Sequence, residues 1–403
     1  MKSILRIFTK RKSQRYGKED GDEPSPAGGE GVAPDEIELE GELDDPSAGH
    51  FEGVTTVKRE PTLNDFTLMQ VLGKGSFGKV VLVKRVTSGR IYAMKILRKA
   101  QLVRAKQIER TKTERRVLQA IDHPFIMRLH YAFQVRSARA HTAAMSSASV
   151  DVPRPPSSQT EDKLYLVLDY CPGGELFFHL SRFRRFPEHV ARFYAAELAL
   201  AIGFLHSRSI IYRDMKPENV RDLGASRTAR FRACVTAGRP RRAPFARAQV
   251  LLDSEGHLKL GDFGLAKDGV TEAAEGAKSI CGTPEYMAPE VLNKLGHGQS
   301  VDWWGLGMIL YELLTGLPPW YTKDRQKLFQ RIRYAPLRLP ATLTPEACDV
   351  LTRLLDRDPL ARLGARRGPE GAADVEAHPF FNEVSARSRV HDSSNARGPP
   401  ARV

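Results

Sequence analysis

Short runs of β-branched and apolar residues dominate the chain from about Leu63 onward. Near the start these runs are separated by turns that contain glycine, a pattern typical of an antiparallel sheet. Residues 101–120 change to helical spacing, because charged positions there separate Ile108, Val117 and Leu118. The predicted strands cover residues 67–72, 80–86, 91–96, 126–133 and 164–168.

The second half of the sequence is mainly helical beyond Gly173. Apolar positions at helical spacing cover residues 190–207 and 301–315, while a short apolar run at 258–260 predicts a strand. Sheet-forming runs followed by helical runs are typical of an α+β fold. We therefore predict a small antiparallel-sheet lobe followed by a larger, mainly helical lobe.

Both ends of the chain differ in composition from this ordered part. Residues 17–50 are rich in Gly, Pro, Glu and Asp and contain few aromatic residues, and such a segment cannot bury enough apolar surface to fold. We predict disordered tails at 1–61 and 383–403, a sheet lobe with its hinge at 62–170 and a helical lobe at 171–382.

Length and composition exclude several classes of protein. The 403 residues are 41% hydrophobic, enough for one large core or two modest ones. No apolar run approaches the roughly 18 residues of a membrane span, so no integral membrane association is expected. The basic residues 1–15 lack an apolar core and a cleavage site, and fit either a solvated tail or a surface-binding helix. Four widely spaced cysteines favour reduced thiols in a cytoplasmic or nuclear protein.

The net charge of +14 would suit a nucleic-acid-binding protein. Most of the excess, however, lies in residues 135–159, 220–249 and 384–403, which carry net charges of +2, +7 and +3. These segments lack the regularly interleaved aromatic residues that base stacking uses. No nucleic-acid partner is therefore expected.

A glycine-rich sequence, G-x-G-x-x-G-x-V, occupies residues 73–80 between two predicted strands. Without side chains at the glycines, backbone amides can approach the phosphates of ATP. A simple glycine turn is the alternative, and a dinucleotide-binding turn is disfavoured because it would lie between a strand and a helix. The predicted phosphate-binding residues are Gly73, Lys74, Gly75, Ser76, Phe77, Gly78 and Val80.

Lys95 lies at the end of a strand-like run, where its ammonium group could reach the α- and β-phosphates. Glu114 is the natural ion-pair partner, because it shares a helix with the apolar face that must pack on the sheet. A solvated surface pair is the ordinary explanation for any single Lys and Glu. The functional interpretation depends on the motifs that follow in order.

The sequence Y-R-D-M-K-P-E-N at 212–219 has the spacing that phosphoryl transfer needs. Asp214 is predicted to orient the substrate hydroxyl and accept its proton. Lys216 is predicted to place a positive charge beside the transferred group, as suits a serine/threonine kinase. Asn219 and Asp262, the latter in the sequence D-F-G after a short strand, are the predicted Mg²⁺ ligands.

Taken together, these motifs resemble the AGC group of serine/threonine protein kinases. The chain is similar to protein kinase B and the ribosomal-protein kinases over about residues 62–382, with further signatures in Y-R-D at 212–214, C-G-T-P-E-Y-M-A-P-E at 281–290 and V-D-W-W at 301–304. The resemblance implies the bilobal protein kinase fold, ATP and Mg²⁺ as cofactors, and proteins as substrates.

The resemblance also implies regulation by phosphorylation. Ser279 occupies the position that an upstream activating kinase would modify. Arg110, Arg213 and Lys267 would form a cationic pocket that orders the segment around the phosphate.

The same resemblance implies a preference for basic substrates. Glu175, Glu218 and Glu312 match acidic positions that in this group select arginines before the target residue, and carboxylate pairing with guanidinium explains the selection. Thr283 would lie near the incoming hydroxyl, bonded to the catalytic aspartate and lysine.

The adenine site follows from the resemblance as well. Asp169 and Cys171 would lie in the hinge, with Leu168 at the border of the pocket and Leu251 beneath the ring. A hydrophobic spine joining the two lobes would stack the side chains of Leu118, Leu129, Tyr212 and Phe263.

Two segments interrupt the resemblance, at 135–159 and 220–249. Both begin with Val-Arg and end in Gln, residues whose codons can contain the borders of an intron, so we hypothesise that both are retained introns. The codons of Val384 and Ser385 can also contain the start of an intron, and the last twenty residues would then replace a C-terminal tail. The alternative is that both segments are genuine insertions. This is harder to accept for 220–249, because it follows the predicted metal ligand Asn219 and catalysis needs geometry fixed within about 0.5 Å.

The leading prediction is transfer of the ATP γ-phosphate to Ser or Thr of basic, arginine-containing proteins in intracellular signalling. The tail of AGC kinases places an aromatic motif beside the helix of Glu114, and no such motif occurs here. As written, the chain is expected to need a partner or to be weakly active. An inactive scaffold with a kinase fold is the alternative, because of the insert after Asn219.

Overall fold

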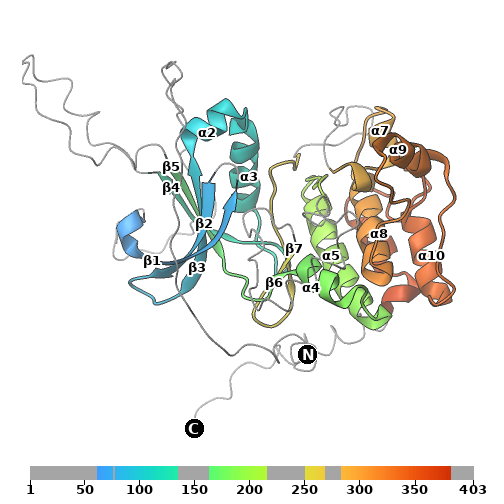
Figure 1. Cartoon of the computed structure of the whole chain (residues 1–403), viewed down its shortest axis with the longest axis horizontal. Helices are drawn as coiled ribbons and strands as arrows, with labels where there is room; N and C mark the ends of the chain where they lie inside the picture. Colours follow the sequence, from blue (N-terminus) through green and yellow to red (C-terminus); the bar gives the residue numbers. More distant parts are fainter. Residues whose placement is uncertain (1–60, 76–77, 135–162, 216–249, 268–282, 383–403) are drawn as a thin grey trace, which may run out of the picture.

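The computed structural model describes residues 61–75, 78–134, 163–215, 250–267 and 283–382. In this part of the chain, a small lobe built on an antiparallel sheet is joined to a larger lobe of helices (Figure 1). The predicted α+β fold, with the sheet lobe before the helical lobe, is therefore confirmed.

Five strands form the sheet of the small lobe, in the order β1-β2-β3-β5-β4, and each pair of neighbours is antiparallel. Alternate side chains of a strand point to opposite faces, and Val83, Met94 and Val167 are fully buried in one hydrophobic cluster. The strands are β1 (Phe66–Gly75), β2 (Gly78–Arg85), β3 (Ile91–Arg98), β4 (Leu129–Gln134) and β5 (Lys163–Asp169).

The helix predicted at 101–120 is divided in two, so the prediction of a single helix is wrong. α2 covers Lys99–Arg104 and α3 covers Ile108–Ala120. Lys106 lies between them with a φ of 51°, and a right-handed helix cannot continue through this left-handed conformation. The interruption lets α3 take its own direction and pack on β4.

The strand predicted at 126–133 begins only at Leu129. The residues before it pair with the large lobe instead, because Ile126 forms a parallel bridge with Leu260 and the Met127 amide donates to the Leu260 carbonyl at 2.8 Å. The sequence does not reveal this division, because Ile126 and Met127 are as apolar as the strand that follows them.

The large lobe surrounds α8 (Ser300–Thr315), in which Trp303 and Trp304 are fully buried. The helices predicted at 190–207 and 301–315 are confirmed as α5 (Glu188–Ser207) and α8. The other helices of the large lobe are α4 (Leu176–Phe183), α7 (Pro289–Leu292), α9 (Arg325–Tyr334), α10 (Pro345–Leu354) and α11 (Pro369–Glu376). The 3-10 turns are η1 (Leu63–Asp65), in the small lobe, and η5 (Pro284–Tyr286) and η6 (Pro379–Phe381).

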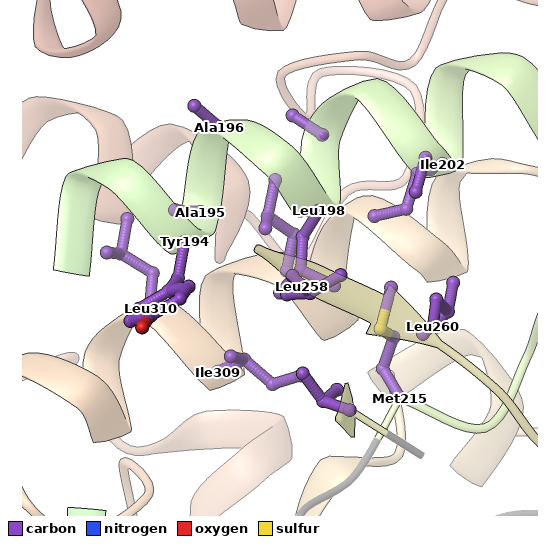
Figure 2. Close-up of a cluster of buried hydrophobic side chains, with 14 of the residues drawn as sticks. Tyr194, Ala195, Ala196, Leu198, Ile202, Met215, Leu258, Leu260, Ile309 and Leu310 are labelled. Carbon is purple, nitrogen blue, oxygen red and sulfur yellow. The ribbon is translucent and has the colours of Figure 1, made fainter. Parts of the chain in front are cut away.

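A second antiparallel sheet contains β6 (Gly174–Glu175), β7 (Val250–Leu252) and β8 (Leu258–Leu260). Figure 2 shows Leu258 and Leu260 of β8 among side chains of α5 and α8, together with Met215. Val250 belongs to the same hydrophobic cluster. The described residues on either side of 216–249 are therefore anchored in one core.

Several predicted segments lie outside the described residues. They are the predicted tail at 1–61 except for residue 61, the predicted tail at 383–403, and the interrupting segments 135–159 and 220–249. In the residues that are described, no helix is both long enough and apolar enough to cross a membrane.

Candidate active site

The structure brings Lys95 and Glu114 together through the packing of α3 beside the sheet. The Lys95 Nζ atom lies 2.6 Å from Glu114 Oε1 and 2.8 Å from Oε2. Only 17% of the Lys95 side chain and 7% of the Glu114 side chain are exposed. A solvated surface pair does not describe this geometry, because both carboxylate oxygens bind a largely buried ammonium group.

Asp262 lies within electrostatic reach of this pair. Burial raises the pKa of Glu114 above its ordinary value, the Lys95 ammonium opposes the rise, and the Asp262 carboxylate adds to it. Asp262 has a φ of 54°, which is uncommon for a residue with a side chain. Residues held in such conformations cluster at functional sites.

The predicted metal ligands supply oxygen atoms, which Mg²⁺ prefers. Among the described residues, no group of three or more His, Cys, Asp and Glu side chains could hold a metal ion by itself. As a predicted ligand, Asp262 would supply one carboxylate and would need others. A second protein ligand and phosphate oxygens, as predicted for Asn219 and ATP, are a set that suits Mg²⁺.

The backbone at the predicted base, Asp214, is fixed by a carboxylate from α8. Asp302 Oδ2 accepts a hydrogen bond from the Tyr212 amide at 2.9 Å, and Oδ1 accepts one from the Arg213 amide at 2.8 Å. His206 of α5 also contacts Asp302 Oδ2, at 2.9 Å. Sequence reasoning used Asp302 only as part of a signature and missed this role, which adjacent residues could not indicate.

A glycine of α8 makes room for the same loop. A Cβ atom at Gly305 would lie 2.6 Å from Met215 Cβ, closer than side chains approach one another. Met215 follows Asp214 and is buried. The glycine therefore allows the loop to lie directly on the central helix.

The predicted hydrophobic spine is brought together in one cluster. Leu118, Tyr212 and Phe263 are buried in it, and Leu129 packs against it. The rings of Tyr212 and Phe263 meet edge to face with centroids 5.3 Å apart. The Tyr212 hydroxyl donates to the Gly261 carbonyl at 2.5 Å, so the loop of Asp214 is tied to the segment of Asp262.

The glycine-rich sequence joins β1 to β2, with Gly75 paired to Gly78. A Cβ atom at Gly78 would lie 1.9 Å from the Ile96 carbonyl oxygen of β3. Glycine is therefore required here for the contact with β3, whatever else the turn binds. Ser76 and Phe77 lie outside the described residues.

Comparison with known proteins agrees with this geometry. The family model described as the protein kinase domain matches residues 66–221 and 247–381. The chain belongs to the protein kinase family. The part left unmatched, 222–246, falls within the interrupting segment 220–249, whereas the match runs across 135–159.

The predicted resemblance to AGC serine/threonine kinases of the protein kinase B type is confirmed by individual relatives. The kinase is 42% identical over 332 residues to the human RAC-beta serine/threonine-protein kinase, an alignment that covers 82% of this chain and 57% of the relative. It is 43% identical over 327 residues to Protein kinase 2 of Dictyostelium discoideum, covering 81% of this chain and 56% of that protein. The chain thus spans little more than half the length of these relatives.

The predicted hinge lies at the end of β5. Asp169 pairs with Tyr92 of β3. Cys171 is buried, and burial, with a contribution from the Asp169 charge, raises the pKa of its thiol to about 12. Leu251 is buried and pairs with Glu175 and with Lys259. Asp169 and Leu251 thus lie on strands of two different sheets, and Cys171 lies in the segment that links β5 to β6.

The predicted substrate-binding acids lie in different surroundings. Burial raises the pKa of Glu175 to about 7. Glu312 is buried in α8 and accepts a hydrogen bond from the Tyr286 hydroxyl. Thr283 lines a cavity together with Asp214, which is consistent with its predicted place near the incoming hydroxyl.

Two of the three cations of the predicted phosphate pocket lie near one histidine. The charges of Arg213 and Lys267 both reach His297, whose pKa is lowered by burial and by these two cations. Arg110 is exposed on α3 and donates to Gln107 at 3.3 Å. The remaining predicted site residues lie outside the described part of the chain: Lys216, Glu218, Asn219 and Ser279.

Proposed function

We propose that this kinase transfers the γ-phosphoryl group of ATP to Ser or Thr hydroxyls of proteins that carry basic residues before the target. The observation that carries the proposal is the buried ion pair of Lys95 and Glu114, 2.6 Å apart, within reach of Asp262. A kinase needs this pair to hold the ATP phosphates at the metal site.

Each residue then has a defined task. Lys95 binds the α- and β-phosphates while Glu114 holds its ammonium group in place. Asp214 orients the substrate hydroxyl and accepts its proton. Asp262 and Asn219 would hold Mg²⁺, which neutralises charge on the phosphate oxygens when bound.

The preference for basic substrates rests on carboxylates. Glu175, Glu218 and Glu312 would pair with arginine guanidinium groups, for which carboxylates are geometrically suited. The raised pKa of Glu175, about 7, supports a binding role, because the positive charge of an arginine would stabilise the ionised form of this partly buried carboxylate.

Control by phosphorylation is part of the proposal. An upstream kinase would modify Ser279, and the phosphate would bind Arg213 and Lys267. Their joint influence on the pKa of His297 supports this, since it means that two cations share one neighbourhood. We also place the protein in the cytoplasm or nucleus, where thiols such as Cys171 stay reduced.

A test compares phosphate transfer to an arginine-rich peptide by the full chain and by Asp214→Asn. Removing a general base lowers the rate by about a hundredfold or more. A second peptide, with alanine in place of the arginines, separates kinase activity from substrate preference.

A catalytically inactive scaffold is the second candidate, and the 30-residue interruption at 220–249 favours it. Equal and negligible phosphate transfer by the wild type and Asp214→Asn would support the inactive scaffold and contradict the proposed enzyme activity. Transfer that depends on Asp214 would do the reverse.

A further inference from the structure

One carboxylate in the hinge contacts three residues from two separate segments of the protein. Asp169 Oδ1 lies 2.7 Å from His130 Nε2, and Oδ2 accepts a hydrogen bond from the Arg128 amide at 3.1 Å. The Lys259 Nζ atom lies 3.5 Å from Oδ2. Asp169 was predicted only as a residue of the adenine site, and none of these contacts was foreseen from the sequence.

These partners come from both lobes. Arg128 precedes β4 and His130 lies within it, in the small lobe, whereas Lys259 belongs to β8 of the large lobe. Lys259 is paired on β7 with Leu251, the residue predicted beneath adenine. The carboxylate therefore lies where the hinge, the small lobe and the base of the nucleotide pocket meet.

The backbone around Asp169 is restrained as well. Its amide donates to the Arg128 carbonyl at 3.2 Å, so Arg128 binds both the main chain and the side chain of this residue. His130 is held in turn by the ring of Tyr92, which meets it edge to face with centroids 4.8 Å apart. Rotating the Asp169 side chain away would break contacts on several sides at once.

The group is ionised in this setting. Burial by itself would raise the pKa of Asp169, but hydrogen bonds from His130 and the Arg128 amide, together with the Lys259 charge, outweigh burial and leave it below its ordinary value. Its side chain is 23% exposed and that of Lys259 is 17% exposed. Hydrogen bonds to a charged group in such partly buried places are stronger than neutral ones.

We propose that the Asp169 carboxylate is a positioning group for nucleotide binding, which fixes the hinge against β4 and β8 and so sets the shape of the adenine site. It acts through the main chain of the hinge and through Lys259, without itself taking part in phosphoryl transfer. The inference rests on the proposed use of ATP.

The test measures the Michaelis constant for ATP and kcat in the full chain for Asp169→Asn, Asp169→Glu and Lys259→Met. We expect Asp169→Asn to raise the constant for ATP about tenfold, within the range typical of coupling between sites, with kcat changed less than about twofold. Asp169→Glu should recover part of the loss. The double variant Asp169→Asn with Lys259→Met should be little worse than Asp169→Asn alone, because contacting residues are not additive.

Asp122→Asn is the matched control. It removes a carboxylate that lies 3.5 Å from the Arg128 guanidinium but is 70% exposed, so it changes charge at the same loop without touching the hinge. Any of three results would overturn the inference. They are an unchanged Michaelis constant for ATP in Asp169→Asn, an equal rise of that constant in Asp122→Asn, or parallel losses of kcat in every variant.

Equilibrium binding of a fluorescent ATP analogue separates this inference from the proposed function. If the wild type binds the analogue but transfers no phosphate, the proposed function fails, and the dissociation constants of the same variants decide the role of Asp169. If Asp169→Asn does not fold, Lys259→Met and Asp169→Glu carry the comparison. No binding by the wild type would overturn both proposals.

Discussion

The Asp302 carboxylate lies 2.8 Å from the backbone nitrogen of Arg213, a residue 89 positions earlier in the chain. A second hydrogen bond, from the Tyr212 amide, reaches the same buried group at 2.9 Å. A side chain of the central helix thus holds the main chain on which Asp214 is presented. A residue of α8 therefore helps to hold this loop in place, together with the hydrogen bond from the Tyr212 hydroxyl to Gly261.

Replacing Asp302 by alanine should therefore weaken both folding and catalysis. One buried amide and one partly buried amide would lose their acceptor, and each unsatisfied buried group costs about 1–3 kcal/mol. We expect the free energy of unfolding to fall by about 2–5 kcal/mol, measured by urea denaturation. Asp302→Asn retains one oxygen acceptor and should lose less. A stable Asp302→Ala variant with full transfer activity would contradict this role.

Glu114→Gln should lower kcat/KM for phosphate transfer by about 10- to 100-fold. The change removes a charge-assisted hydrogen bond worth about 1.5–3 kcal/mol, and each 1.4 kcal/mol is about a factor of ten in rate. Steady-state kinetics with a basic peptide measure the loss. Lys112→Met is the control, because Lys112 forms an exposed pair with Glu109 on the same helix. Equal effects of the two variants would remove the special role of Glu114.

The affinity for arginine-containing peptides should rise with pH. The pKa of Glu175 is about 7 in the absence of substrate, so the carboxyl is mostly neutral at pH 6 and mostly ionised at pH 8. Only the ionised form attracts a guanidinium group. The Michaelis constant for the peptide should fall by up to about tenfold between these two values.

Two comparisons isolate this titration. Glu175→Gln should bind the peptide weakly and with no dependence on pH over the same range. A peptide in which alanine replaces the arginines should be equally insensitive. The same pH dependence in Glu175→Gln would assign the titration to another group.

Deleting residues 220–249 should raise the rate of phosphate transfer. The deletion joins Asn219 directly to Val250, the first residue of β7, and Met215 and Val250 already share one hydrophobic cluster. Misplacement of a catalytic group by about 1 Å can cost about a hundredfold in rate, so we expect a gain of at least about tenfold.

Deletion of 135–159 is the natural comparison. It shortens the connection between β4 and β5, away from the predicted base, and should change the rate little. A lower rate after deletion of 220–249 would mean that this segment belongs to the working enzyme. Sequencing the transcript across both segments gives an independent answer, because retained introns would be absent from the mature message.

The spacing of apolar residues predicted an element well where the same regular spacing runs through the whole element. The strand of Lys95 and the helices α5 and α8 were predicted because their apolar positions repeat regularly. The same reasoning failed at residues 101–120, where Lys106 has a φ of 51°. Backbone conformation at one residue leaves the hydrophobic spacing unchanged, so the break was invisible in the pattern.

The sequence by itself determined the kinase motifs and their order, because each motif is a short continuous stretch of chain. These motifs contain the residues proposed to carry the chemistry: Lys95, Glu114, Asp214 and Asp262. Only the tertiary structure decided what holds them. Asp302 reaches the loop of Asp214 from α8, and Lys259 reaches the hinge from β8. Such contacts join residues far apart in sequence, and their strength comes from burial, which depends on how all the elements pack together.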